Sequence, residues 1–200
     1  KELHFSTFRC PRCWFPFNVK GTSFCICSQM PMLSFSQNVR FLVYMHHREL
    51  YNCGDDAKIL LCAAPDRTEL YVMGRSGDDA QLRSSVAAAD RAILLFPDDL
   101  ACNATEFCAE WKRALDLAEG TERELAIVVL DGTWGSVKRL RKNFLQKISP
   151  GIPHVRLDDV VLSVYVRRQT RQDGVSTIEA LALLLQHLGE TPEVCSELIR

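Results

Sequence analysis

ELAIVVLDGTW, residues 124–134, is the stretch that decides the fold of this 200-residue chain. Its apolar run carries no alternating polar residue, which is typical of a strand buried on both faces of a parallel sheet. Asp131, Gly132 and Thr133 end the run, and a segment with helical periodicity follows. The sequence therefore predicts a strand over 124–131 and a helix over 134–145.

The same alternation of short apolar runs and helical segments extends in both directions from this stretch. It predicts further strands over 40–45, 69–74, 92–97 and 154–159, and further helices over 55–64, 78–90, 104–118 and 176–188. Strands that alternate with helices favour an α/β fold in which a mostly parallel sheet carries helices on both faces.

Composition sets the scale of the molecule and limits its partners. The chain is 47% hydrophobic and has a formal net charge of -1, so we expect one main domain, and a polyanionic partner would need a local basic patch. The longest apolar runs fall short of the roughly 20 residues that cross a bilayer, and KELHFSTFRC at the start is not a secretory signal pattern. We expect an intracellular protein, cytoplasmic or nuclear, with no membrane partner.

Four of the nine cysteines lie within residues 10–27, as a C-x-x-C pair and a C-x-C pair: Cys10, Cys13, Cys25 and Cys27. Two close pairs of thiolates supply the four tetrahedral ligands that zinc prefers, which indicates a structural Zn2+ site without an open position for chemistry. The alternative is two disulfides. We predict a zinc-binding module over 1–35 and a main domain over 36–200, and assign no chemistry to the five scattered cysteines.

Ligands of parallel sheets lie beyond the carboxyl ends of the strands, so the residues there are the candidate site. Three segments qualify: FPDD (96–99), DGTW (131–134) and GVSTIE (174–179). Asp131 or Thr133 could simply cap the next helix, and Ser176 with Glu179 forms a capping box. A helix start also attracts anionic ligand groups, so the two interpretations coexist. No dinucleotide or phosphate-loop glycine motif is present.

Basic residues form two groups near these segments, one over 138–147 and one over 167–171. A charged run usually faces solvent, but two groups beside one ligand edge favour contacts with a phosphate backbone. The histidines at 46 and 47 follow the strand over 40–45. Adjacent side chains of an extended chain point in opposite directions, so we do not expect a paired metal site there.

Together these motifs resemble the DTW-domain family. The matching segments run in order along nearly the whole chain: Cys10-Pro-Arg-Cys13, Cys25-Ile-Cys27, Leu94-Leu-Phe-Pro97, Asp131-Gly-Thr-Trp134, Tyr165-Val-Arg167-Arg168-Gln169 and Ser176-Thr-Ile-Glu179. The resemblance implies a tRNA-uridine aminocarboxypropyltransferase related to the SPOUT methyltransferases, whose chain forms a C-terminal trefoil knot around an S-adenosyl-L-methionine pocket. It implies that the loops lining this pocket contain Phe96, Pro97, Asp131, Gly132, Thr133, Trp134, Ser176, Thr177 and Glu179.

Two segments depart from the family pattern. The family's Q-H-P-x-E reads here as Met45-His46-His47-Arg48-Glu49, and its N-T-[AG]-R reads as Asp55-Asp56-Ala57-Lys58. Only the histidine, the glutamate and the last positive charge are kept, so the substrate contacts that the resemblance implies for these two segments do not carry over, whereas the cofactor loops are unaffected.

The implied reaction moves the 3-amino-3-carboxypropyl group to N3 of a tRNA uridine and leaves methylthioadenosine. N3 must lose a proton, and Asp131 is the candidate base. The expected RNA contacts are Lys138, Arg139, Lys142, Arg167 and Arg168. Alternatives are an RNA methyltransferase that uses the same cofactor, and a zinc-bearing RNA-binding module without catalysis. The sequence sets neither the tRNA, the uridine nor the oligomeric state.

Overall fold

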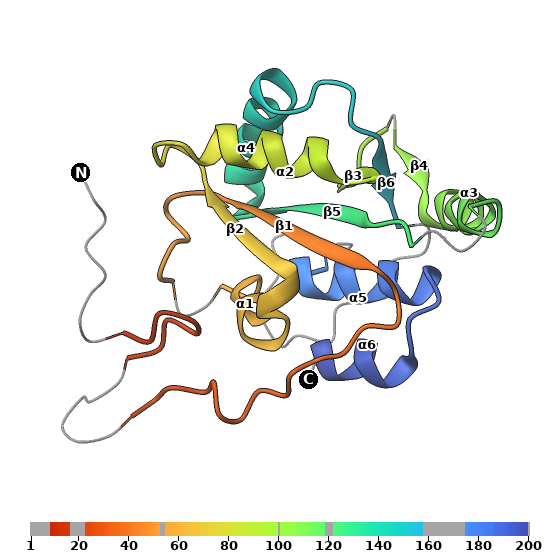
Figure 1. Cartoon of the computed structure of the whole chain (residues 1–200). Helices are drawn as coiled ribbons and strands as arrows, with labels where there is room; N and C mark the ends of the chain where they lie inside the picture. Colours follow the sequence, from red (N-terminus) through yellow and green to blue (C-terminus); the bar gives the residue numbers. More distant parts are fainter. Residues whose placement is uncertain are drawn as a thin grey trace.

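A six-stranded sheet forms the centre of the molecule (Figure 1), seen in a computed structural model that describes residues 9–16, 23–52, 55–99, 101–118, 122–157 and 175–199. Every described strand pairing is parallel, and the strand order is β2-β1-β5-β3-β6-β4. The strands are β1 (Val39–Met45), β2 (Thr68–Val72), β3 (Arg91–Leu95), β4 (Cys102–Asn103), β5 (Leu125–Asp131) and β6 (His154–Arg156).

Helices cover both faces of the sheet, as Figure 1 shows. One face packs against α2 (Asp78–Ala88) and α4 (Trp134–Lys147). The other packs against α1 (Lys58–Ala63), α3 (Ala104–Asp116), α5 (Thr177–His187) and α6 (Pro192–Ile199). Within the described ranges, no helix combines the length and apolar character that a membrane span requires.

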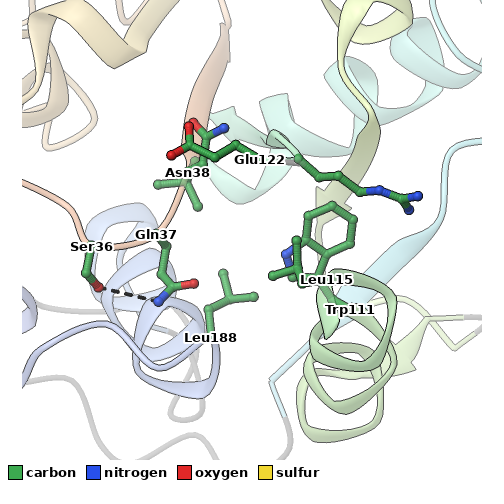
Figure 2. A pocket seen from close by; sticks show the side chains of 9 residues that line it. Ser36, Gln37, Asn38, Trp111, Leu115, Glu122 and Leu188 are labelled. Atoms are coloured by element: carbon green, nitrogen blue, oxygen red, sulfur yellow. Dashed lines mark hydrogen bonds between the residues drawn. The ribbon is translucent and has the colours of Figure 1, made fainter. Parts of the chain in front are cut away.

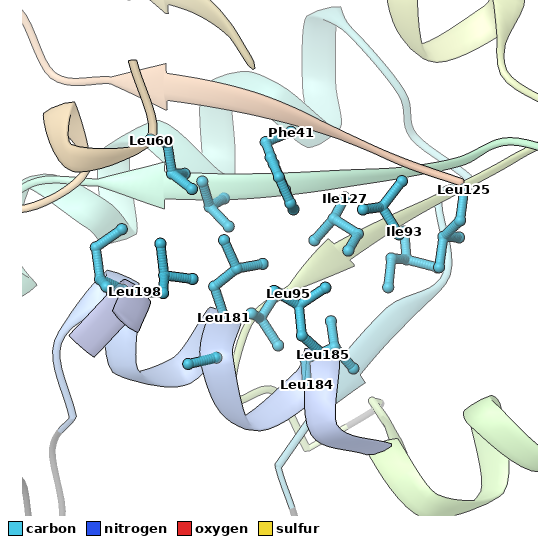
Figure 3. Close-up of a cluster of buried hydrophobic side chains, with 14 of the residues drawn as sticks. Phe41, Leu60, Ile93, Leu95, Leu125, Ile127, Leu181, Leu184, Leu185 and Leu198 are labelled. Carbon is cyan, nitrogen blue, oxygen red and sulfur yellow. The ribbon is translucent and has the colours of Figure 1, made fainter. Parts of the chain in front are cut away.

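The side chains of β5 alternate between two hydrophobic cores, because successive residues of a strand point to opposite faces. Ile127 and Val129 enter the core shared with α5, while Val128 and Leu130 enter the core shared with α4. Figure 3 shows Ile127 among the leucines of α5. Complete burial of one such side chain contributes about 1.5–3 kcal/mol. Tertiary packing on two sides therefore holds β5 in place and fixes the face to which Asp131 belongs.

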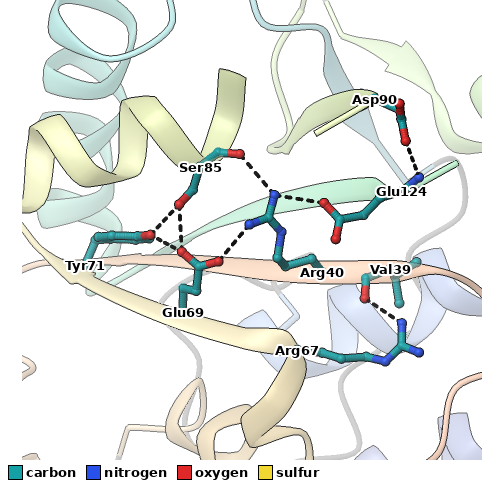
Figure 4. A network of polar contacts seen from close by, with 8 residues as sticks. All are labelled: Val39, Arg40, Arg67, Glu69, Tyr71, Ser85, Asp90 and Glu124. Atoms are coloured by element: carbon teal, nitrogen blue, oxygen red, sulfur yellow. Dashed lines mark hydrogen bonds and ion pairs between the residues drawn. The ribbon is translucent and has the colours of Figure 1, made fainter. Parts of the chain in front are cut away.

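A polar network fastens the edge of the sheet (Figure 4). The guanidinium of Arg40 donates to Glu69 at 2.9 Å and forms an ion pair with Glu124 at 2.8 Å. Glu69 also accepts hydrogen bonds from Tyr71 and Ser85. Although burial opposes ionisation, these donors hold the pKa of Glu69 below its usual value. The network joins β1, β2, α2 and the residue that precedes β5, so these charged side chains stabilise the fold.

Glu190 anchors the turn between α5 and α6. Its carboxylate, 5% exposed, accepts hydrogen bonds from the Ser36 amide at 2.9 Å and the Gln37 amide at 3.2 Å. It accepts two more from the Ser36 hydroxyl at 3.0 Å and the Thr191 amide at 2.9 Å. A single buried carboxylate thus ties the C-terminal helices to the segment that enters β1.

The expected α/β architecture with helices on both faces is confirmed. The largest shift of an element start concerns the helix expected over 55–64, which begins at Lys58 and leaves residues 55 and 56 in the preceding turn. Two elements, α6 and the two-residue strand β4, were not predicted from the sequence. Residues 158–174, and with them Arg167 and Arg168, lie outside the described residues.

Candidate functional site

The carboxyl ends of β1 and β5 lie side by side, where Met45 pairs with Asp131. The chain leaves β1 toward α1 on one face of the sheet and leaves β5 toward α4 on the other face. Neighbouring parallel strands whose connections diverge in this way open a crevice at their carboxyl ends, and ligands of α/β sheets bind there. Asp131 stands at this position.

Asp131 faces the first turn of α5. It is 4% exposed, and the hydroxyl of Thr177 donates to its Oδ1 at 3.3 Å. The odd positions of β5 point toward α5, which explains why the carboxylate meets that helix start. Two of the predicted segments, 131–134 and 174–179, therefore meet in space although 46 residues separate the bonded pair.

Two further carboxyl groups, which sequence reasoning did not select, join Asp131. Oxygens of Asp55, Asp56 and Asp131 all lie within 4.8 Å of one another. Asp55 is 7% exposed and accepts a hydrogen bond from the Lys58 amide at 3.2 Å. Burial raises the pKa of Asp131 well above its usual value, and the neighbouring Asp55 raises it further. The only feature of the sequence that pointed to Asp55 was its position in the segment Asp55-Asp56-Ala57-Lys58, which departs from the family pattern.

The DGTW turn combines packing with helix capping. Thr133 caps α4 by accepting a hydrogen bond from the Ser136 amide at 3.4 Å, whereas Asp131 does not cap this helix. A Cβ added to Gly132 would lie 3.2 Å from the Cβ of Ser136 and 3.4 Å from that of His46. The glycine therefore permits close approach within the protein. Trp134 begins α4 half-buried.

His46 supports the turn from the neighbouring strand. Its amide donates to the Asp131 carbonyl at 2.9 Å, and its side chain is 2% exposed. Burial, followed by the charge of His47, lowers the pKa of His46. The two rings lie 4.3 Å apart between centroids, so the expectation that they point in opposite directions is wrong. The chain leaves the extended conformation after β1 and turns over residues 47–50.

The start of α5 forms the predicted capping box. Ser176 accepts a hydrogen bond from the Glu179 amide at 3.2 Å, and Glu179 accepts one from the Ser176 amide at 2.8 Å. These contacts use both polar side chains. The amides of Thr177 and Ile178 have no partner within the part of the chain that the structure describes, so they are the donors left for an anionic ligand group.

The FPDD segment follows β3, which pairs with β5. Phe96 is half-buried under the guanidinium of Arg141, 5.6 Å from its ring centroid, and Pro97 is exposed. Arg141 forms an ion pair with Asp98, whose carboxylate also contacts His154 at 3.2 Å. This member of the basic group on α4 therefore serves to hold the FPDD loop.

Three other members of that basic group, Lys138, Arg139 and Lys142, are exposed on the outer side of α4. These exposed basic residues thus lie on the helix that begins directly after the DGTW turn. The second predicted basic group contains Arg167 and Arg168, which lie outside the described residues. Only the first group is thus placed beside the site.

The cysteine cluster has the geometry of a four-sulfur metal site. The Sγ atoms of Cys10, Cys13, Cys25 and Cys27 lie within 4.8 Å of one another, with 3.5 Å between the first and last and 3.7 Å between the middle pair. Four thiolates around one zinc ion lie about 3.8 Å apart. Sulfurs of a disulfide lie about 2.05 Å apart, so two disulfides do not fit. The cluster could hold a metal ion.

The knuckle that carries Cys10 and Cys13 is a tight turn packed on the main domain. The Trp14 amide donates to the Cys10 carbonyl at 3.0 Å. Trp14 adopts a φ of 60°, in the left-handed region, and its side chain is 1% exposed in the core shared with α5. Burial opposes ionisation of Cys10, but backbone amides and neighbouring thiols lower its pKa to about 7. A buried anchor thus compensates for the unusual backbone.

The helix α1 connects this knuckle to the acidic group. Cys62 on α1 is buried against the cluster, and its carbonyl accepts a hydrogen bond from Arg12 at 2.9 Å. The ammonium of Lys58, in the first turn of α1, lies 4.9 Å from the ring centroid of Phe15. Sequence analysis gave Cys62 no role. Its place beside the four thiols follows from α1 packing, which spacing alone does not show.

A small pocket of about 200 Å³ lies at the opposite, amino end of β1 (Figure 2). Trp111 and Leu115 of α3 form one wall, and Gln37 with Leu188 forms another. The pocket lies where β1 begins, whereas Asp131 lies beside the other end of β1. None of the predicted site residues lines it.

Residues 7–200 match the DTW domain family. Comparison with curated proteins and with solved structures gives no match. The family match covers the cysteine knuckle, the sheet and the three candidate segments FPDD, DGTW and GVSTIE. The chain therefore belongs to the DTW-domain family.

Proposed function

We propose that this protein transfers the 3-amino-3-carboxypropyl group of S-adenosylmethionine to N3 of a uridine in tRNA. Membership of the DTW family indicates a tRNA-modifying enzyme. The observation that carries the finer proposal is Asp131, a buried carboxyl group at the divergence of β1 and β5 that faces the amino end of α5. This arrangement joins a candidate base to donors for an amino-acid carboxylate.

The residues present suit S-adenosylmethionine. The buried acidic group attracts a cationic ligand, and the amides of Thr177 and Ile178 suit its carboxylate. Phe96 and Trp134 offer aromatic surface at the same edge. When bound, the cofactor supplies an electrophilic carbon beside its sulfonium.

Asp131 takes the proton from N3 of the uridine. The amides of Thr177 and Ile178 would hold the cofactor, whose carbon–sulfur bond would break as the N3–carbon bond forms, and the electron pair would leave on sulfur in neutral methylthioadenosine. Thr177 orients the Asp131 carboxyl by donating to Oδ1. Gly132 and His46 keep the turn in place through close packing. The protein thus contributes a proton acceptor and positioning.

The tRNA lies along α4 in this proposal. Lys138, Arg139 and Lys142 contact its phosphates, and Arg167 and Arg168 extend that contact. N3 lies on the pairing edge of the base, so the target uridine must be unpaired when it reaches Asp131.

The cysteine cluster binds zinc in this proposal. Four thiol ligands leave no open position, so the ion holds the 1–35 module and does no chemistry. The 36–200 domain is SPOUT-like, with a C-terminal trefoil knot around the cofactor. Solving the structure with S-adenosylmethionine bound tests this topology directly.

Incubation of the protein with unmodified tRNA and labelled S-adenosylmethionine tests the function. We expect nucleoside mass analysis to show an aminocarboxypropyl uridine and the reaction mixture to contain methylthioadenosine. Adenosylhomocysteine as the by-product would identify a methyltransferase instead. If calorimetry detects binding of tRNA but none of S-adenosylmethionine, the protein is a non-catalytic RNA-binding module and the proposal fails.

A further inference from the structure

Two carboxyl groups of the acidic cluster are buried in contact with each other. Asp55 and Asp131 are 7% and 4% exposed, and carboxylate oxygens of the two residues lie within 4.8 Å of each other. Asp131 ends β5, while Asp55 precedes α1, so packing of separate elements brings them together. Two adjacent negative charges without solvent repel each other strongly, because the interior screens them poorly.

The oxygen atoms of Asp55 show where this repulsion is relieved. Its Oδ1 accepts the Lys58 amide. Its Oδ2 is buried and has no hydrogen-bond donor among the residues that the structure describes. A buried carboxylate oxygen without a donor is costly, whereas a protonated oxygen becomes a donor itself. Asp131 is the partner within reach, because carboxylate oxygens of the two residues lie within 4.8 Å of each other, and either carboxyl group can carry the proton.

We propose that Asp55 and Asp131 share one proton, and that Asp55 thereby determines when Asp131 can accept a proton from the substrate. Asp55 is a positioning residue in this proposal, since it acts through Asp131. The part that concerns catalysis rests on the proposed function, whereas the shared proton does not.

Other charged groups around the pair also act on this state. Asp56 and Glu49 each raise the pKa of Asp131 through their negative charge. Lys58 opposes this state at Asp55, because its amide and its positive charge both lower the pKa of Asp55. His46, beside the DGTW turn, has a pKa lowered by burial. The charges that act on Asp131 itself therefore favour retention of the proton there.

A shared proton has a defined consequence for the reaction. While Asp131 carries the shared proton it cannot accept one from N3, so activity rises with pH as the pair releases that proton, through the raised pKa of Asp131. In exchange, the carboxylate that results is a stronger base than an isolated aspartate. The pair then holds the substrate proton in the place of the one it released.

Asp55→Asn is the decisive variant, because an amide donates to Asp131 without a titrating proton. It removes the like charge and lowers the pKa of Asp131. The pH at which kcat/KM for tRNA rises should fall by more than about one pH unit. Asp56→Asn is the matched control, since it removes the same charge from a residue that acts on the pair through charge alone. Its shift should be smaller.

Carbon NMR of protein labelled at the aspartate carboxyl carbons tests the shared proton without any activity. We expect one carboxyl signal of the wild type to titrate well above the usual aspartate range of about 4, and to return toward that range in Asp55→Asn. Ordinary titration of every aspartate in the wild type would overturn the proposal, as would an unchanged signal in Asp55→Asn.

Two further outcomes separate the proposals. If millimolar magnesium chloride abolishes the high titration, a cation and not a proton occupies the pair, and the inference is wrong. If the titration persists in magnesium and shifts in Asp55→Asn while no uridine is modified, the shared proton is supported and the proposed transferase function fails.

Discussion

Replacing Asp131 with asparagine should abolish most turnover without disturbing the fold. Asparagine has the same shape, its carbonyl can accept the Thr177 hydroxyl that lies 3.3 Å from Oδ1, and its amide can donate to Asp55. The contacts of this 4% exposed side chain are therefore kept, and only the proton acceptor is lost.

The expected loss follows from the role of a positioned base. Removal of general-base catalysis lowers the rate by about 10²–10⁴-fold, which corresponds to about 3–5 kcal/mol in the activation free energy. The free energy of unfolding at pH 7 should not fall, because the variant replaces one of two adjacent buried acids with a neutral amide.

Single-turnover transfer of the labelled aminocarboxypropyl group to tRNA measures the rate, calorimetry measures cofactor binding, and urea denaturation measures stability. Asp56→Asn is the control for charge, and it should retain far more activity than Asp131→Asn. Full turnover of Asp131→Asn would remove the residue from the base role. Loss of cofactor binding in parallel with turnover would instead assign it to binding.

Three other perturbations probe the zinc module, the RNA surface and the fold. Cys25→Ser should release one zinc ion per chain, as metal analysis would show. It should lower Tm and the affinity for tRNA, both measured by calorimetry, more than it lowers the rate of the chemical step. Cys102→Ser, at an exposed cysteine outside the cluster, should cause neither zinc loss nor these decreases. Lys142→Ala should reduce the slope of log Kd against log salt by about 0.7–0.9, while Lys112→Ala on α3 should leave it unchanged. Glu190→Ala should lower the free energy of unfolding by about 3 kcal/mol in urea titrations, and Glu190→Gln, which keeps an acceptor, by less.

The sheet could be predicted from sequence because both of its faces are covered. Burial on two sides makes β5 a continuous apolar run, and helical periodicity resumes directly after Thr133. Strand order carries no such signal. That β5 lies between β1 and β3 follows from packing between distant segments, and it decides which carboxyl ends become neighbours.

The site was predictable where capping or family motifs mark it and not where contacts alone create it. The Ser176 and Glu179 capping box was confirmed, as was the cap from Thr133. Asp55 escaped selection because its segment was expected to be helical, whereas the turn before α1 carries it toward Asp131. Cys62 escaped because no spacing rule connects a helix residue to a knuckle some 50 positions earlier.

The position of β5 also has a consequence for how the molecule is made. Synthesis delivers β1, β2 and β3 before β5 exists, yet β5 separates β1 from β3 in the finished sheet. A nascent chain that ends before residue 125 therefore leaves the facing edges of β1 and β3 unpaired, and unpaired strand edges are surfaces on which chains associate wrongly. The pairs that β5 forms with β1 join segments that lie far apart in the sequence, and contacts of this kind slow folding. The strand that brings the candidate base is thus also the one whose arrival joins β1 to β3.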